Sequence, residues 1–281
     1  MKNPNEIQSK CARRLVTAVL GCVVVTTLYP IYWLIVNSFR HTEQIVTGDT
    51  FGLPTELYLG NYYDAVVNRH VFRYFTNSVI YTLLTIALTV VISTMLAYAL
   101  TRMQWKYKKQ GMSIAMLGIL LPSQIVVIPI FILMRKLHLV DNPLSIIIVI
   151  SAFNIGISTM IASGFLKGIP YEMEEAAIMD GCGIFRLFFG IIFPLLKSPI
   201  AAMSIYIFLN SWNEFIYSLV LLNSDGKKTL PLMLLGYSTR SGSNFGGLFA
   251  AMVITSFIPI MIYLFFSKQV EKAISASSIL K

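Results

Sequence analysis

The chain has few charged residues. Only 12% of its 281 residues are Asp, Glu, Lys or Arg, and 56% are hydrophobic. Soluble domains carry about 25% charged residues, so this composition argues against an ordinary soluble protein. With a mean hydropathy of +0.71 and many long apolar runs, the chain is expected to be a polytopic membrane protein.

Cysteine and histidine are also scarce. The three cysteines, Cys11, Cys22 and Cys182, are odd in number, and the sequence contains no CxxC pair. This argues against a disulfide framework and against a zinc site. The three histidines are scattered along the chain. We therefore expect no metal, no cofactor and no catalytic residue, so the protein should not itself be an enzyme.

The chain lacks the GxxxxGK[ST] loop that holds nucleotide phosphates. If ATP drives its activity, a partner must hydrolyse the ATP. The net charge of +9 could indicate nucleic-acid binding. The Lys and Arg residues lie in short loops beside apolar runs, however, as in membrane proteins, so we expect no nucleic-acid partner.

Six apolar runs are each close to the length of about 20 residues that crosses a bilayer as a helix. Separate spans of this length satisfy their backbone in lipid only as helices. The sequence thus predicts an all-α membrane protein with a single domain over residues 1–281. The predicted spans cover residues 15–38, 76–101, 111–133, 145–166, 198–222 and 246–267.

The larger share of Lys and Arg lies on one side of these spans, in segments 1–14, 102–110, 167–197 and 268–281. Cytoplasmic loops carry the excess of positive charge. We therefore expect both termini and the loop 167–197 to be cytoplasmic and the six spans to lie in the lipid bilayer.

The loop 167–197 contains a predicted short helix. Pro170 suits a first helical position, and the acidic residues that follow suit the positive end of the helix dipole. The spacing places Met173, Ala176, Ala177 and Asp180 on one face with little side-chain bulk. Gly181 then supplies a turn position. Such a face is typical of docking on another protein.

The same segment resembles the cytoplasmic motif of ABC-importer permeases: E-A-A, three residues, G, nine residues, then I-x-L-P. Phe193 stands where that family usually has Leu. The residues in register are Glu175, Ala176, Ala177, Gly181, Ile191 and Pro194.

Segments 121–124 (LPSQ) and 211–215 (SWNEF) resemble the carbohydrate branch of these permeases, specifically the shorter maltose-type subunit. The resemblance implies a coupling helix between helices 4 and 5, with Asp180 among its contacts. It also implies a bacterial cytoplasmic membrane location. The implied partners are a second, dissimilar permease, a dimeric cytoplasmic ATPase, an extracytoplasmic binding protein and a carbohydrate. The tail 270–281 lacks the glycines common in this family.

Polar residues share one predicted helical face of the fifth span. Hydroxyls, amides and aromatic rings are the groups that bind a sugar, so the stripe is a candidate substrate path. Polar contacts between packed helices explain it equally well, and the sequence leaves both open. The residues are Tyr206, Asn210, Asn213, Glu214 and Tyr217.

A second polar row follows the second span. Because small polar residues usually pack membrane helices closely, we interpret it as a packing face. The row is Asn77, Tyr81, Thr85, Thr89 and Ser93.

The sequence favours the permease subunit of an ATP-driven, binding-protein-dependent carbohydrate importer. An ABC permease for a non-sugar solute is the nearest alternative. An ion-coupled secondary carrier is a weaker one, because such carriers need paired intramembrane acids or broken helices and only Glu214 stands out among the spans. The sequence does not identify the solute.

Overall fold

The computed structural model describes residues 4–48, 52–54, 56–239 and 242–278. The last three residues of the predicted tail, 279–281, lie outside this part. The chain divides into two compact units, Met1–Val71 with Leu234–Phe257, and Phe72–Met233 with Ile258–Lys281. Apart from one short β-hairpin, the regular structure in the described residues is helical.

The first unit contains a long N-terminal helix followed by short elements. Asn61 fixes the end of that helix, because its Nδ2 donates hydrogen bonds to the carbonyls of Ser38 (2.9 Å) and Arg40 (2.7 Å). The elements are α1 (Pro4–Ser38), α2 (Thr42–Thr47), α3 (Gly60–Tyr63), the π-helix η1 (Asp64–Asn68), η4 (Leu234–Tyr237), β1 (Ser238–Thr239), β2 (Gly242–Ser243) and the first part of α14 (Phe245–Ser278).

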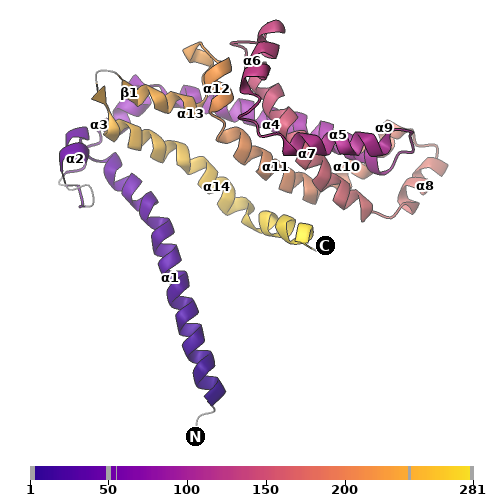
Figure 1. Cartoon of the computed structure of the whole chain (residues 1–281), viewed down its shortest axis with the longest axis horizontal. Helices are drawn as coiled ribbons and strands as arrows, with labels where there is room; N and C mark the ends of the chain where they lie inside the picture. Colours follow the sequence, from indigo (N-terminus) through magenta and orange to yellow (C-terminus); the bar gives the residue numbers. More distant parts are fainter. Residues whose placement is uncertain (1–3, 49–51, 55, 240–241, 279–281) are drawn as a thin grey trace. The chain divides into compact units, whose positions relative to one another are not determined.

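The second unit is a helical bundle in which α7 lies against both α5 and α11 (Figure 1). Its elements are α4 (Val71–Thr101), α5 (Lys108–Leu120), α6 (Val127–Lys136), α7 (Pro143–Lys167), α8 (Glu172–Met179), α9 (Ile184–Leu187), the π-helix η2 (Phe188–Ile192), α10 (Phe193–Leu195), α11 (Lys197–Trp212), α12 (Ile216–Leu221), η3 (Asp225–Lys227), α13 (Leu230–Met233) and the last part of α14.

Helix α7 begins and packs as its sequence dictates. Asn142 caps the helix by accepting a hydrogen bond from the amide of Leu144 (3.0 Å), and Pro143 occupies the first turn. On the α5 side, a Cβ added to Gly156 would lie 2.6 Å from the carbonyl oxygen of Ala115. Glycine at 156 therefore permits the close approach of α5 and α7.

The polar row on α4 packs against neighbouring segments, as predicted. Thr85, Thr89 and Ser93 are fully buried. Ser93 Oγ lies 3.4 Å from the carbonyl of Ile155 on α7. At the other end of the row, Asn77 Nδ2 donates to the carbonyls of Gly226 and Lys228, each at 2.9 Å. Asn77 and Ser93 thus satisfy backbone groups inside the unit, whereas the hydroxyls of Thr85 and Thr89 are buried without a hydrogen-bond partner in the described part of the chain.

Within the described residues, four helices are long and apolar enough to cross a membrane, and up to five spans result if one bent helix pair is counted as a span. The four match the first, second, fourth and sixth predicted spans. They are Ala12–Ser38, Val71–Thr101, Pro143–Lys167 and Phe245–Ile262.

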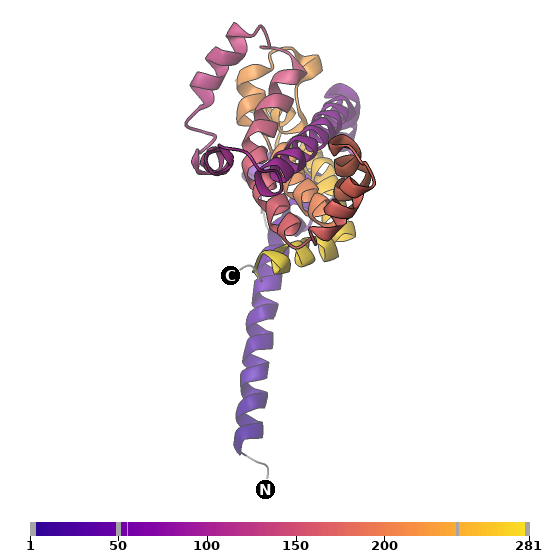
Figure 2. The ribbon, with the colours of Figure 1, turned by 90° about the vertical axis from the view of Figure 1, so that its right-hand side faces the viewer.

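The third and fifth predicted spans are not continuous helices. In the third, α5 ends at Leu120 and α6 begins at Val127, and the two helices point in different directions (Figures 1 and 2). Leu121 is extended, with φ −84° and ψ 111°, because the following Pro122 disfavours a helical residue before it. In the fifth, the helix stops at Trp212 and restarts at Ile216.

Candidate functional site

Helix α8 ends in a Schellman motif at Gly181. The amide of Gly181 donates to the carbonyl of Ile178, and the amide of Cys182 donates to that of Ala177, both at 2.9 Å. Gly181 has φ +79°, a left-handed conformation that glycine adopts without strain. A Cβ at Gly181 would meet nothing within 4 Å, so backbone conformation rather than space explains the glycine.

The residues of the predicted small face of α8 differ in their exposure. Ala177 is only 7% exposed and packs into the apolar core of the second unit with Leu187 and Leu196. Ala177 therefore faces inward and is not available to a partner, contrary to the sequence interpretation. Ala176 and Asp180 are exposed, as predicted.

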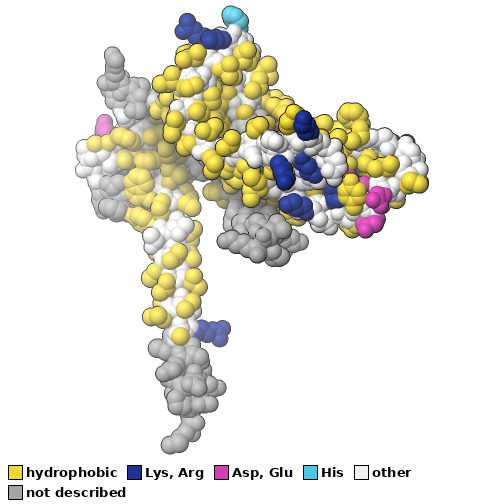
Figure 3. Space-filling view, turned by 45° about the vertical axis from the view of Figure 1, so that its right-hand side comes forward, with side chains coloured by type: hydrophobic (Ala, Val, Ile, Leu, Met, Phe, Trp, Pro, Cys, Tyr) yellow, Lys and Arg dark blue, Asp and Glu magenta, His cyan; other side chains and the backbone are white. Residues whose placement is uncertain are grey.

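Large apolar side chains lie exposed around the α8 turn. Met179 is 86% exposed, Phe185 is 70% exposed, and Ile178 and Ile184 are also exposed. Glu175 is exposed beside them. Figure 3 shows acidic side chains next to apolar ones on the part of the surface that carries this loop. Exposed apolar side chains grouped within a polar rim are typical of protein interaction sites.

The rest of the loop continues through α9, η2 and α10 and then bends. The bend between residues 184–195 and 197–212 is 76°. We predicted a break at Pro194, but the helical stretch continues to Leu195 and breaks at Leu196, because proline is tolerated in the first turn of α10. Pro194 is exposed, and Ile191 is partly buried against the core.

The sequence interpretation missed one role in this loop. Glu174, which we assigned to the helix dipole, is 2% exposed, and its Oε1 lies 3.2 Å from Nε of Arg102. Nothing local in the sequence reveals this pair, because its members come from segments far apart in the chain.

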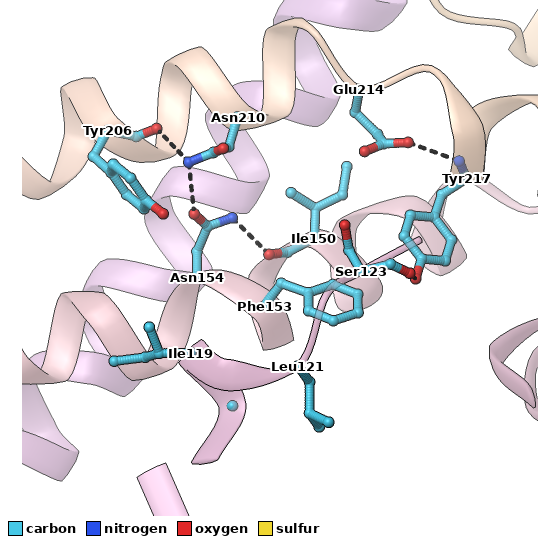
Figure 4. Close-up of a pocket in the computed structure, with 11 residues that line it drawn as sticks. Ile119, Leu121, Ser123, Ile150, Phe153, Asn154, Tyr206, Asn210, Glu214 and Tyr217 are labelled. Carbon is cyan, nitrogen blue, oxygen red and sulfur yellow. Dashed lines mark hydrogen bonds between the residues drawn. The ribbon is translucent and has the colours of Figure 1, made fainter. Parts of the chain in front are cut away.

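A polar pocket of about 190 Å³ lies in the second unit (Figure 4). The helices α7 and α11 form its walls, together with the α5–α6 connection. It includes four of the five residues of the predicted substrate stripe, all except Asn213. Its polar and aromatic lining comes from Ser123, Phe153, Asn154, Tyr206, Asn210, Glu214 and Tyr217.

Two amides connect the walls of this pocket. Asn210 Nδ2 donates to Asn154 Oδ1 at 3.3 Å, and Asn154 Nδ2 donates to the carbonyl of Ile150 at 2.8 Å (Figure 4). Tyr217 OH donates to the carbonyl of Ser123 at 2.6 Å. The stripe residues therefore make contacts between helices while also facing a cavity.

The stripe does not follow one helical face, contrary to the prediction. The helix breaks at Asn213–Phe215, and Tyr217 belongs to α12. Glu214 caps this second helix, because its Oε1 accepts a hydrogen bond from the amide of Tyr217 at 2.7 Å. Asn213 is exposed and donates a hydrogen bond to the carbonyl of Leu209, and it is not among the residues that line the pocket.

A second connection that the sequence interpretation missed involves Asp141, between α6 and α7. Its carboxylate accepts hydrogen bonds from Ser224 Oγ (2.5 Å), the amides of Asn223 and Ser224 (3.0 and 2.9 Å) and Lys227 Nζ (3.0 Å). These bonds, those from Ser224 first, hold the pKa of Asp141 well below its usual value. The carboxylate thus fixes the loop after α12 to the start of α7.

The apolar helices, the exposed loop helix and the internal polar pocket define a polytopic α-helical membrane protein. Residues 89–276 match the family of inner membrane components of binding-protein-dependent transport systems. The chain belongs to this family.

Two relatives match over nearly their whole lengths. The chain is 31% identical to the arabinooligosaccharides transport system permease protein AraQ of Halalkalibacterium halodurans, over 90% of this chain and 91% of AraQ. It is 27% identical to the diacetylchitobiose uptake system permease protein DasC of Streptomyces coelicolor, over 94% and 95%. Both relatives are named as permease proteins, in agreement with the transport-system family to which the chain belongs.

The fold is similar to that of a solved transporter. A chain in the crystal structure of a bacterial ABC transporter involved in the import of the acidic polysaccharide alginate superposes with a TM-score of 0.82. The alignment covers 93% of this chain and 97% of that chain at 22% identity. The likeness supports the ABC-importer permease fold expected from the sequence.

Proposed function

We propose that this chain is the permease subunit of an ATP-driven carbohydrate importer in a bacterial cytoplasmic membrane. With α5–α6 and the interrupted segment α11–α12 completing two further crossings, it spans the membrane six times with both termini in the cytoplasm. A second, dissimilar permease completes the path. A dimeric cytoplasmic ATPase powers it, and an extracytoplasmic binding protein delivers the solute.

The exposed apolar turn of α8 is the observation that carries this proposal. The chain has no phosphate-binding loop of its own, so energy must enter through a contact with a partner. Met179 and Phe185 project from a loop whose backbone is fixed by the Gly181 turn. A partner cleft that receives these side chains would bury apolar surface worth roughly 25 cal/mol per Å². Glu175 and Asp180 flank this surface.

Carbohydrate is the proposed solute on two grounds. The relative AraQ is named for the transport of arabinooligosaccharides and DasC for the uptake of diacetylchitobiose. The pocket offers amides, a carboxylate and aromatic rings, which suit hydroxyl groups and the C–H faces of sugar rings. Its volume of about 190 Å³ is below the roughly 300–1,000 Å³ of complete ligand pockets. We infer that this chain supplies one wall of the path.

The docking role is tested by co-purification of the ATPase with the tagged permease complex. We expect Met179→Lys to reduce the amount of bound ATPase several-fold, because a charge replaces an apolar contact. Met103→Lys is the matched control, since Met103 is a 41% exposed methionine in the other predicted cytoplasmic loop. Equal ATPase recovery from both variants would contradict the docking role of α8.

The solute class is tested with the cognate binding protein. Calorimetry would compare oligosaccharides, polyol phosphates and peptides as ligands. We expect heat of binding only with an oligosaccharide. Binding of a phosphate ester or a peptide instead would assign the chain to a non-sugar importer and leave the docking role intact.

A further inference from the structure

Glu174 lies on the exposed loop helix α8 but is itself buried. Its side chain is 3% exposed, and that of Arg102 is 9% exposed. Oε1 of Glu174 lies 3.2 Å from Nε of Arg102, and Oε2 accepts a hydrogen bond from Tyr98 OH at 2.9 Å. Both carboxylate oxygens therefore face groups at the end of α4.

Arg102 also reaches a third segment. Its Nη2 donates to the carbonyls of Leu166 and Ile169, where α7 ends. Its guanidinium lies 5.3 Å from the centre of the Tyr171 ring, directly before α8. A cation at a helix C-terminus is favoured by the helix dipole. One arginine side chain thus joins the ends of α4 and α7 to the start of α8.

We propose that Glu174 and Arg102 are positioning residues that make α8 move as one piece with α4 and α7. This proposal rests on the function proposed above, in which α8 receives the movement of the ATPase. Separating a buried ion pair costs free energy, because it leaves uncompensated charges in the protein interior. The guanidinium is also held by the two carbonyls at the end of α7 and lies over the Tyr171 ring, so Arg102 is fixed at several points. Displacement of α8 is therefore transmitted to the two long helices rather than absorbed in the loop.

The neighbouring glutamates provide the contrast. Glu172 and Glu175 are exposed on the same helix, so a link to α4 is not a general property of acidic residues there. Glu172→Gln is accordingly the matched control for a change at Glu174.

The test compares wild type, Glu174→Gln, Glu172→Gln and the double variant Arg102→Met with Glu174→Met, each in the full complex. The double variant removes the link without leaving a lone buried charge, so it should fold, as apolar replacements of buried ion pairs often do. Hydrogen exchange of the α8 amides is the first readout. The second is solute transported per ATP hydrolysed.

We expect faster exchange in α8, with exchange in α11 unchanged, for the double variant and to a smaller extent for Glu174→Gln. Coupling between distant sites typically changes the affinity at one site by about 5–150-fold. If coupling is lost to a similar extent, transport per ATP in the double variant should fall about five-fold or more. The ATPase should still co-purify. Glu172→Gln should match wild type in both readouts.

Exchange and coupling in the double variant equal to those of wild type would overturn the proposal, because the pair would then only neutralise charge. Failure of the wild-type complex to retain the ATPase would instead overturn the proposed function. The exchange readout tests the link between α8 and α4 in that case too, since it needs only the permease chains.

Discussion

Asn210 on α11 donates a hydrogen bond of 3.3 Å to Asn154 on α7, and both residues line the polar pocket. The sequence leaves open whether the polar stripe lines a substrate path or packs helices together, and this pair is compatible with both. The amides hold helices together, and they also present polar atoms to a cavity. Transport and stability measurements on the same variants separate the two roles.

Asn210→Ala is expected to weaken transport more than stability. Asn210 is exposed, and a typical hydrogen bond contributes about 0.5–1.5 kcal/mol, so loss of a solute contact should raise the KM for uptake roughly 2–10-fold. Uptake kinetics and the Tm in detergent check this. Asn213→Ala is the matched control. Asn210 donates to the carbonyl of Tyr206 and Asn213 to that of Leu209, each four residues earlier, but Asn213 does not line the pocket. Equal KM values would remove Asn210 from the path.

Gly181→Val is expected to weaken the α8 turn. A side chain in the left-handed region costs about 1–2 kcal/mol, and a β-branched residue there is a clear outlier. We expect lower ATPase recovery and faster hydrogen exchange at the end of α8. Gly181→Asn is the control, since asparagine tolerates the left-handed conformation and there is open space for it. If both variants lose the ATPase alike, backbone conformation is not the cause.

Gly156→Ala is expected to destabilise the bundle. The added Cβ would lie 2.6 Å from a backbone oxygen of α5, and overpacking of this kind typically costs 1–3 kcal/mol. Thermal unfolding of the purified chain checks this. Gly21→Ala on α1 meets nothing within 4 Å, so it should leave the Tm unchanged or raise it slightly. A Tm for Gly156→Ala equal to that of wild type would contradict the close α5–α7 contact.

The stability of the folded chain should depend on pH in the acid range because of Asp141. Because its pKa is lowered in the folded state, its contribution is fully present above the ordinary Asp pKa of about 3.9. It is lost as the pH falls from there towards the lowered value. We expect Asp141→Asn to have a lower Tm than wild type at neutral pH, and the difference to shrink below about pH 4. A difference independent of pH would show that the Asp141 charge is not involved.

The sequence predicted the helical class, the α8 helix and its glycine turn well, because these depend on local signals. Apolar run length marks a span, and Gly181 marks a position with positive φ. The two interrupted spans show the limit of run length. Residues 121–126 and 213–215 are short interruptions inside longer apolar runs, so run length does not reveal them. The first break depends on Pro122, and the helix after the second break is capped by Glu214.

Contacts between segments that are distant in the chain could not be predicted from the sequence. The Glu174–Arg102 pair, the Asp141–Ser224 bonds and the inward orientation of Ala177 each depend on how helices pack. A pattern of one acidic helix turn does not distinguish the buried Glu174 from the exposed Glu175. The candidate pocket was predicted in part, because Tyr206 and Asn210 share one helical face, whereas Asn154 comes from another helix.

In the proposed function, a partner ATPase powers solute movement through this chain. The most direct test is uptake of a labelled oligosaccharide by proteoliposomes that contain both permeases, with and without the ATPase subunits, ATP and an ionophore. We expect uptake to require the binding protein, the ATPase and ATP, and to persist when the ionophore removes ion gradients. Uptake by the permeases alone that the ionophore abolishes would contradict it.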